Sequence, residues 1–309
     1  MVLLIQYTII FAVVLTVVAL AGMWSERSGV INIGLEGTMV MGALAGAIAM
    51  RYLPLTIPGG LYVIIVMLIA IVAGILYSLL LALAAVTFKA NQTITGTAMN
   101  ILATALSIVI VKAITLNEDG KASIKLEFIE ARKFFVVQLG GFEFNWFMLV
   151  MVIILIVSMI VLYRTKFGLN LMSCGENPQA ADSNGINVKK MRYIGVMISG
   201  ALSGIGGLAF IMGANSSWQF DAGVNGFGFL ALAVMILGQW KPFLIFLGAI
   251  LFGLLRALSL SYTSFGWMAL DSTFYLVLPY VVCLIVLCIT SKKSKAPKAE
   301  GIPYDKGLR

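Results

Sequence analysis

About nine long runs of apolar residues limit what this chain can fold into. A helix needs roughly 20 apolar residues to cross a bilayer, and its backbone polar groups must all be bonded within the segment. The run 226–240 is short for a span, and the run 60–86 is long enough to be tilted or kinked. The pattern predicts an all-α polytopic membrane protein with about nine transmembrane helices, at residues 3–23, 32–50, 60–86, 97–116, 146–163, 193–213, 226–240, 242–261 and 271–290.

Composition supports this prediction and excludes several classes of protein. Hydrophobic residues make up 61% of the 309 residues and charged residues 11%, where soluble proteins carry roughly 25% charge. The chain has no histidine, no phosphate-binding loop, and no zinc-protease or nucleophile-elbow motif, which argues against an ATPase or a membrane enzyme. The three cysteines lack metal-ligand spacing. We therefore expect no metal and no cofactor, and we attribute the net charge of +8 to membrane topology rather than to nucleic-acid binding.

Basic residues predict the orientation, because loops rich in lysine and arginine stay in the cytoplasm. The loop 164–192 and the tail 291–309 both carry clusters of these residues. Alternation of the spans then places the N-terminus and the loop 117–145 outside. That loop carries four basic residues, but five acidic residues balance them. We expect one transmembrane domain over residues 1–290 and a basic cytoplasmic tail over 291–309.

Two segments suggest an internal repeat. Gly34–Gly46 and Gly226–Gly238 are each followed by a proline and an apolar run. An odd number of spans separates them, so they would insert in opposite directions. Inverted repeats are common in transporters, whose substrate path lies at the repeat interface near the midplane. Close helix packing is the plainer explanation for most glycines here, such as Gly200 and Gly204, and the sequence leaves both explanations open.

Three polar residues within the runs are candidates for a translocation path: Asn32, Glu36 and Asn100. Asn32 and Glu36 are four residues apart, which places both on one face of a helix. Glu36 is equally explained as a helix-terminal carboxylate stabilised by the helix N-terminus. The amide of Asn100 needs partners that lipid cannot supply, whereas Thr104 and Ser107 on the same face can bond to backbone carbonyls. Pore lining and helix packing both remain open for these residues.

A polar segment between two apolar runs cannot lie in the bilayer core, and it offers a soluble partner a short helix. Residues 173–207 read SCGENPQAADSNGINVKKMRYIGVMISGALSGIGG. Here the chain resembles the coupling loop of ATP-binding-cassette importer permeases, in the branch that serves ribose, galactose, nucleosides and branched-chain amino acids. By this resemblance, the candidate ATPase-coupling residues are Gly175, Glu176, Asn177, Pro178, Ala180, Ala181, Asp182 and Gly185.

A second segment sharpens the resemblance. Residues 28–46 read SGVINIGLEGTMVMGALAG and resemble the opening of the nucleoside-type permeases, although sugar permeases carry relatives of this run. The matching residues are Ser28, Gly29, Asn32, Gly34, Glu36, Gly37, Gly42 and Gly46. The resemblance extends from about residue 20 to about residue 290.

The resemblance implies a multi-subunit complex in the plasma membrane of a bacterial cell. A helix near Glu176–Asp182 would dock into a groove on a cassette ATPase, often one chain with tandem cassettes. A second homologous permease, often longer, would complete the pathway as a heterodimer. An extracellular substrate-binding lipoprotein would deliver the substrate, and the lipid bilayer would surround the spans.

Three functions compete at this point. The first is nucleoside uptake by an ATP-driven importer, with this chain as a non-catalytic permease subunit. The second is uptake of a simple sugar such as ribose or galactose by the same kind of machine. The third is an ion-coupled carrier, which would normally show acidic or histidine relays in its spans and would need no coupling loop. The sequence does not name the substrate, because specificity in such systems resides largely in the receptor.

Overall fold

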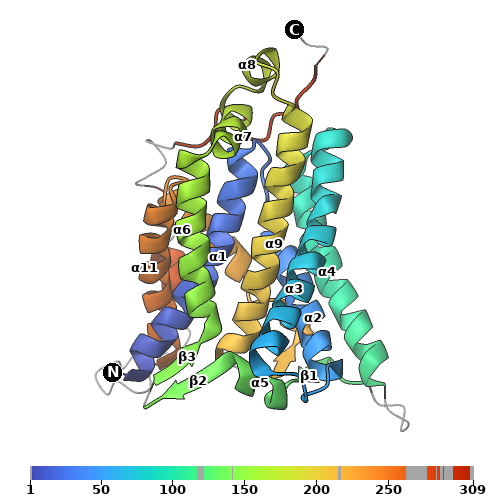
Figure 1. Ribbon diagram of the computed structural model, residues 1–309, viewed down its shortest axis with the longest axis vertical. Helices are drawn as coiled ribbons and strands as arrows, with labels where there is room; N and C mark the ends of the chain where they lie inside the picture. The colour runs from blue at the N-terminus through green and yellow to red at the C-terminus, as the bar shows by residue number, and fades with distance from the viewer. Residues whose placement is uncertain are drawn as a thin grey trace.

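Helices follow the apolar runs of the sequence closely in the computed structural model (Figure 1). The structure describes residues 2–116, 122–140, 142–214, 217–261, 277–282, 284–285, 288 and 295–306. The main helices of the bundle are α1 (Val2–Arg27), α2 (Leu35–Tyr52), α3 (Gly59–Ala82), α4 (Gln92–Thr115), α6 (Trp146–Arg164), α9 (Val188–Ala214), α10 (Phe227–Leu237) and α11 (Pro242–Ser261).

Six of the helices in the described part of the chain are long and apolar enough to cross a membrane: α1, α3 with the turn that follows it, α4, α6, α9 and α11. The chain is therefore a polytopic membrane protein. The predicted total of about nine spans stays a prediction, since the run 271–290 lies largely outside the described residues. The long run 60–86 contains a local irregularity, because α3 continues into a π-helical turn, η1 (Leu83–Thr87).

The prediction of an all-α fold needs correction, because the chain also forms two small antiparallel sheets. Strand β1 (Lys125–Glu127) pairs with β4 (Ser217–Gln219), and β2 (Val136–Leu139) pairs with β3 (Phe142–Asn145). The short helix α5 (Ile129–Phe135) separates β1 from β2. Valine and phenylalanine in these connections favour extended pairing once the chain has left the helices. The protein is mostly helical rather than all-α.

The centre of the bundle is α9, which packs against α1, α2 and α3. Glycines permit this close approach. A Cβ atom at Gly42 on α2 would lie 2.4 Å from the Cα atom of Gly204 on α9. A Cβ atom at Gly74 on α3 would lie 2.2 Å from the carbonyl oxygen of Gly200. Close helix packing is therefore confirmed as the role of Gly200 and Gly204.

The two ends of the bundle differ in what covers them (Figure 1). The hairpin end carries the start of α1, α5 and the two sheets, and it lies at the bottom of the figure. The α8 end lies at the top and carries α7 (Lys166–Glu176) and α8 (Pro178–Ser183). The last residue of α1, Arg27, also lies there, because its guanidinium is 3.9 Å from the carboxylate of Glu176.

Two helices, α2 and α10, begin inside the bundle rather than at one of its ends. At 1.5 Å per residue, α1 is about 39 Å long and α2 about 27 Å, so the connection 28–34 returns about 12 Å into the bundle. Helix α10 is about 16 Å long and ends near the α8 end, where the Trp240 indole donates to Glu26. The two helices start at similar depth and run in opposite directions, as an inverted repeat requires.

Candidate translocation and coupling sites

Glu36 joins the N-terminal ends of the two helices that begin inside the bundle. It lies in the first turn of α2. Its Oε1 atom accepts a hydrogen bond from the backbone N–H of Gly226 at 2.8 Å, and its Oε2 atom accepts one from Gly228 at 2.6 Å. The first N–H groups of a helix lack partners within the helix and favour a negative charge. The carboxylate therefore caps α10 while it sits at the start of α2.

Asn100 performs a similar role for α2. Its Oδ1 atom accepts from the backbone N–H of Gly37 at 2.7 Å, and its Nδ2 atom donates to the carbonyl of Ile33 at 3.0 Å. The hydroxyls of Thr104 and Ser107 donate to carbonyls of their own helix, α4. The packing explanation therefore accounts for Thr104 and Ser107, whereas Asn100 bonds to the buried turn that opens α2.

Asn32 lies outside the helix in which it was predicted. Helix α2 begins at Leu35, so the argument that Asn32 and Glu36 share one helix face was wrong. The connection 28–34 is held out of the helix by other bonds, such as that from the backbone N–H of Ile31 to the Gln92 side chain at 2.7 Å. The Asn32 amide donates to the Ser199 hydroxyl at 2.9 Å. Its Oδ1 atom is buried without a hydrogen-bond partner among the described residues.

The three predicted path residues thus gather around one place, the N-terminus of α2, about 12 Å below the α8 end. All three are at least nine-tenths buried. Glu36 and Asn100 bond to backbone groups at the starts of helices, whereas Asn32 bonds to the Ser199 hydroxyl of α9. The free acceptor of Asn32 can take one further hydrogen-bond donor.

The residues predicted to couple the chain to an ATPase fall on two short helices. Asn177 caps α8, because its Oδ1 atom accepts from the backbone N–H of Ala180 at 3.0 Å, and Pro178 occupies the first turn. Ala181 is buried, whereas Ala180 is exposed. Gly185 follows the helix with φ of +80°, a conformation that favours glycine. A short, capped helix with one exposed face therefore projects from the bundle.

Gly175 and Glu176 belong to the preceding helix, so the predicted start of the coupling helix needs correction. Both residues close α7, and the next helix starts at Pro178. Gly175 is pressed against α1, since a Cβ atom there would lie 2.4 Å from the carbonyl oxygen of Arg27. Proline cannot continue a hydrogen-bonded helix, which explains why the break falls at Asn177.

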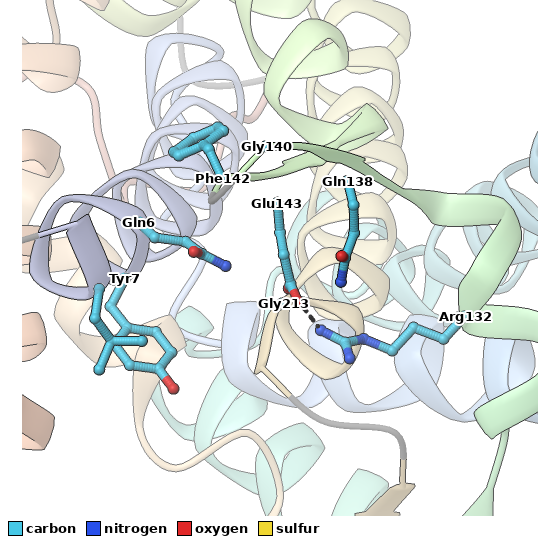
Figure 2. A pocket seen from close by; sticks show the side chains of 9 residues that line it. Gln6, Tyr7, Arg132, Gln138, Gly140, Phe142, Glu143 and Gly213 are labelled. Atoms are coloured by element: carbon cyan, nitrogen blue, oxygen red, sulfur yellow. Dashed lines mark hydrogen bonds and ion pairs between the residues drawn. The ribbon is translucent and has the colours of Figure 1, made fainter.

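The sequence reasoning missed a polar hollow at the hairpin end, shown in Figure 2. Its volume is about 360 Å³, and its polar lining includes Gln6, Tyr7 and Gln138. Across it, Arg132 forms an ion pair with Glu143 at 3.2 Å. None of the three predicted path residues lines this hollow. The structure therefore does not bring it together with the buried cluster around Glu36.

Charged residues of the α8 end were used in the sequence only to predict the orientation of the chain in the membrane. Glu26 is buried and accepts from the Trp240 indole at 2.6 Å. Arg192 is 1% exposed and donates to the carbonyl of Ile302 at 2.8 Å. The sequence offered a clue, because Glu26 and Arg192 each lie next to a long apolar run, where water cannot fully solvate a charge.

Comparisons with known proteins agree along the whole chain. A family model described as "Branched-chain amino acid transport system / permease component" matches residues 4–287. The guanosine ABC transporter permease protein of Bacillus subtilis is 36% identical over 315 residues, covering 98% of this chain and 96% of that protein. A nucleoside ABC transporter permease protein of Lactococcus lactis is 34% identical over 310 residues, covering 96% and 95%. A putative glucose ABC transporter permease protein of Haloferax volcanii is 30% identical over 285 residues, covering 87% and 80%.

This chain belongs to that family of permease components. The permease is a membrane component of an ABC transport system and is not itself the catalytic subunit. Membership implies an ATPase and a substrate-binding protein as partners. Six described helices long and apolar enough to cross a membrane are consistent with this membership.

Proposed function

We propose that the permease forms half of the pathway of an ATP-driven importer of nucleosides. The observation that carries the proposal is the near full-length similarity to two permeases named for guanosine and for nucleosides. The resemblance of residues 28–46 to nucleoside-type permeases points the same way. An ion-coupled carrier no longer competes, because the chain belongs to a family of ABC permease components.

In this proposal, α8 docks on the ATPase and the α8 end faces the cytoplasm. The basic residues of the loop 164–192 and of the tail support that orientation. An impermeant thiol reagent should label Ser123→Cys but not Lys298→Cys in intact cells, each in a background without other cysteines. Labelling of Lys298→Cys would reverse the assignment.

The partners follow from the family resemblance. We propose a tandem-cassette ATPase, a second homologous permease that makes a heterodimer, and a substrate-binding lipoprotein outside a bacterial plasma membrane. ATP binding would close the cassettes and move α8, which favours one conformation of the spans over the other. The substrate would pass near Asn32, Glu36 and Asn100, where the N-termini of α2 and α10 meet inside the bundle. Such sites near the bilayer midplane are typical of transporters with inverted repeats.

Uptake of a simple sugar is the second candidate. The similarity to a putative glucose permease of Haloferax volcanii favours it. The two candidates separate in one experiment. The full complex, reconstituted in liposomes with its binding protein, should accumulate labelled guanosine in an ATP-dependent manner, and excess unlabelled ribose or glucose should not compete. Accumulation of glucose or ribose without accumulation of any nucleoside would select the sugar proposal.

The docking role of α8 has its own test. Ala180 is exposed on α8, so Ala180→Arg should leave the fold intact while placing a bulky charge in the interface. We expect the variant permease to insert normally but to lose co-purification with the ATPase and to lose uptake. Lys189→Ala, at an exposed position just beyond the helix, is the control. Gly175→Pro would be a poor probe, because Gly175 packs on Arg27.

A further inference from the structure

A short segment of the C-terminal tail crosses the α8 end instead of extending away from it. We call residues Lys295–Lys306 the inner strap. The backbone N–H of Lys295 donates to the Gln239 side chain at 2.9 Å, beside the end of α10. The backbone N–H of Ala299 donates to the carbonyl of Gly175 on α7 at 2.8 Å. The strap is thus bonded to two separate elements of the bundle.

The strap also lies directly on the connection between α1 and α2. The backbone N–H of Gly301 donates to the carbonyl of Gly29 at 3.3 Å. Gly301 has φ of +75°, and a Cβ atom there would lie 2.7 Å from the Cδ1 atom of Ile31. No side chain fits between the two segments at this point. The strap therefore covers the segment that leads down to Glu36.

Arg192, in the first turns of α9, is wedged beside this crossing. Its Nη1 atom donates to the carbonyl of Ile302. Its Nη2 atom lies 2.8 Å from the place that a Cβ atom of Gly29 would occupy. The guanidinium thus fills the space that glycine leaves and holds the strap and the connection at a fixed spacing.

Tyr304 ties the other end of the strap to α8. Its ring lies in a small buried cluster with Cys174 of α7, Ala181 of α8 and Val188 of α9. Lys306 lies 4.0 Å from Asp182 on the same face of α8. Ala181 is the buried residue of α8, so Tyr304 contacts the side of that helix opposite to its exposed face.

We propose that the inner strap transmits movement of α8 to the connection 28–34, with Tyr304 and Arg192 as positioning residues. Tyr304 follows Ala181 when α8 moves, and the strap carries Gly301 and the bonded Gly29 with it. The displacement reaches Ile31, two residues beyond Gly29 on the same connection, while the bonds of Glu36 hold the deep end of the connection in place. Contiguous packed elements of this kind are the physical route by which distant sites are coupled. The proposal rests on the proposed docking of α8 to the ATPase.

The test follows Ile31, which lies under the strap, and needs no transported substrate. Ile31→Cys is placed in a permease with Cys283→Ser and Cys288→Ser, and the complex is purified with its ATPase. The rate of labelling by a soluble maleimide is measured without nucleotide and with ATP and vanadate. We expect ATP to change the rate about tenfold, within the range of typical allosteric coupling. The same permease with Ile31 retained measures any labelling of Cys174.

In Tyr304→Ala, we expect the nucleotide-dependent change at Ile31→Cys to disappear while ATPase binding and basal ATPase activity persist. Tyr304→Phe should restore the change, and Ile302→Ala, whose side chain is exposed, should leave it intact. Gly301→Ala, in the middle of the strap, should abolish the change without altering the contact with α8. An unaltered response in Tyr304→Ala and Gly301→Ala, or no response in the unmodified strap, would overturn the proposal. Failure to accumulate guanosine would refute the proposed substrate and leave this readout unaffected.

Discussion

Two buried carboxyl sites flank the connection 28–34, and they are satisfied in different ways. At the deep end, both oxygens of Glu36 accept from backbone N–H groups at the start of α10. At the shallow end, Glu26 shares a side-chain hydrogen bond with Glu300 of the inner strap and accepts from Trp240. The deep site has the partners that an ionised carboxylate needs, whereas a bond between two carboxyl groups requires a proton on one of them.

This difference assigns separate physical roles to the two ends of one short segment. The bonds at Glu36 are charge-assisted and join the starts of α2 and α10, so they resist separation of these two helices. The pair Glu26–Glu300 depends on a proton, so its strength changes with pH. We infer that the deep end fixes the geometry of the pathway and that the shallow end is the part that releases.

The largest effect is expected at the deep end. Glu36→Leu leaves two buried N–H groups of α10 without acceptors, each at a cost of about 1–3 kcal/mol, and should abolish uptake and lower the yield of folded permease. Glu36→Gln keeps one acceptor but turns an N–H₂ group toward the other donor, so uptake should fall strongly with near-normal yield. Both are measured as uptake at matched permease levels. Wild-type uptake in Glu36→Gln would show that uptake requires the shape of this side chain but not its charge.

A smaller effect is expected at the neighbouring cap. Asn100→Leu removes the bonds to Gly37 and Ile33, so transport should slow while complex assembly and basal ATPase activity remain. Thr104→Val is the matched control on the same helix, because the Thr104 hydroxyl donates to the Asn100 carbonyl of its own helix rather than to α2. Equal uptake in the two variants would return Asn100 to a simple packing role.

The smallest effect is a pH dependence at the shallow end. Burial raises the pKa of Glu300 from 4.5 to about 7 when the strap is docked. The docked strap therefore binds a proton more tightly than the free strap, and docking weakens as pH rises from 4.5 toward about 7, above which no further loss follows. The charged group that contacts Glu300 is Glu26 of α1. Other charged groups on elements that touch the strap are Glu176 of α7, paired with Arg27 of α1, and Arg192 of α9.

Labelling of Ile31→Cys reports this release. The labelling rate is divided by that of a free cysteine at the same pH, because the reactive thiolate fraction itself rises with pH. This normalised rate should rise across the interval between the two pKa values, and the rise should be lost in Glu300→Gln, which stays neutral at every pH. Lys298→Gln, on an exposed position of the same strap, is the control. A rise of the normalised rate that persists in Glu300→Gln would assign the titration to another group.

Much of the fold followed from the sequence, because the bilayer imposes a simple length and polarity rule. The apolar runs marked the helices closely, and close packing at Gly200 and Gly204 was correctly expected. Helix boundaries inside the bundle were harder to predict. Asn32 lies in an apolar stretch and was assigned to a helix, but side chains distant in sequence, such as Gln92, hold that segment extended.

The candidate site was predictable in its members but not in its geometry. Glu36 and Asn100 stood out as polar groups in apolar runs, which is a local property. Their partners, Gly226 and Gly228 for the first and Gly37 for the second, depend on how α2, α4 and α10 meet. The inner strap escaped prediction for a similar reason, since its lysines resemble those of a solvated tail.

The glycine contacts of α9 decide where the molecule can bend. Backbone meets backbone at Gly42 and Gly204 and again at Gly74 and Gly200, with no side chain between them to change rotamer. Sliding one of these helices past another would bring backbone atoms into collision. Helices α2, α3 and α9 are therefore expected to move as one rigid unit. Other helices would move relative to this unit during the transport cycle, so probes placed on α2 and α9 should keep a constant separation.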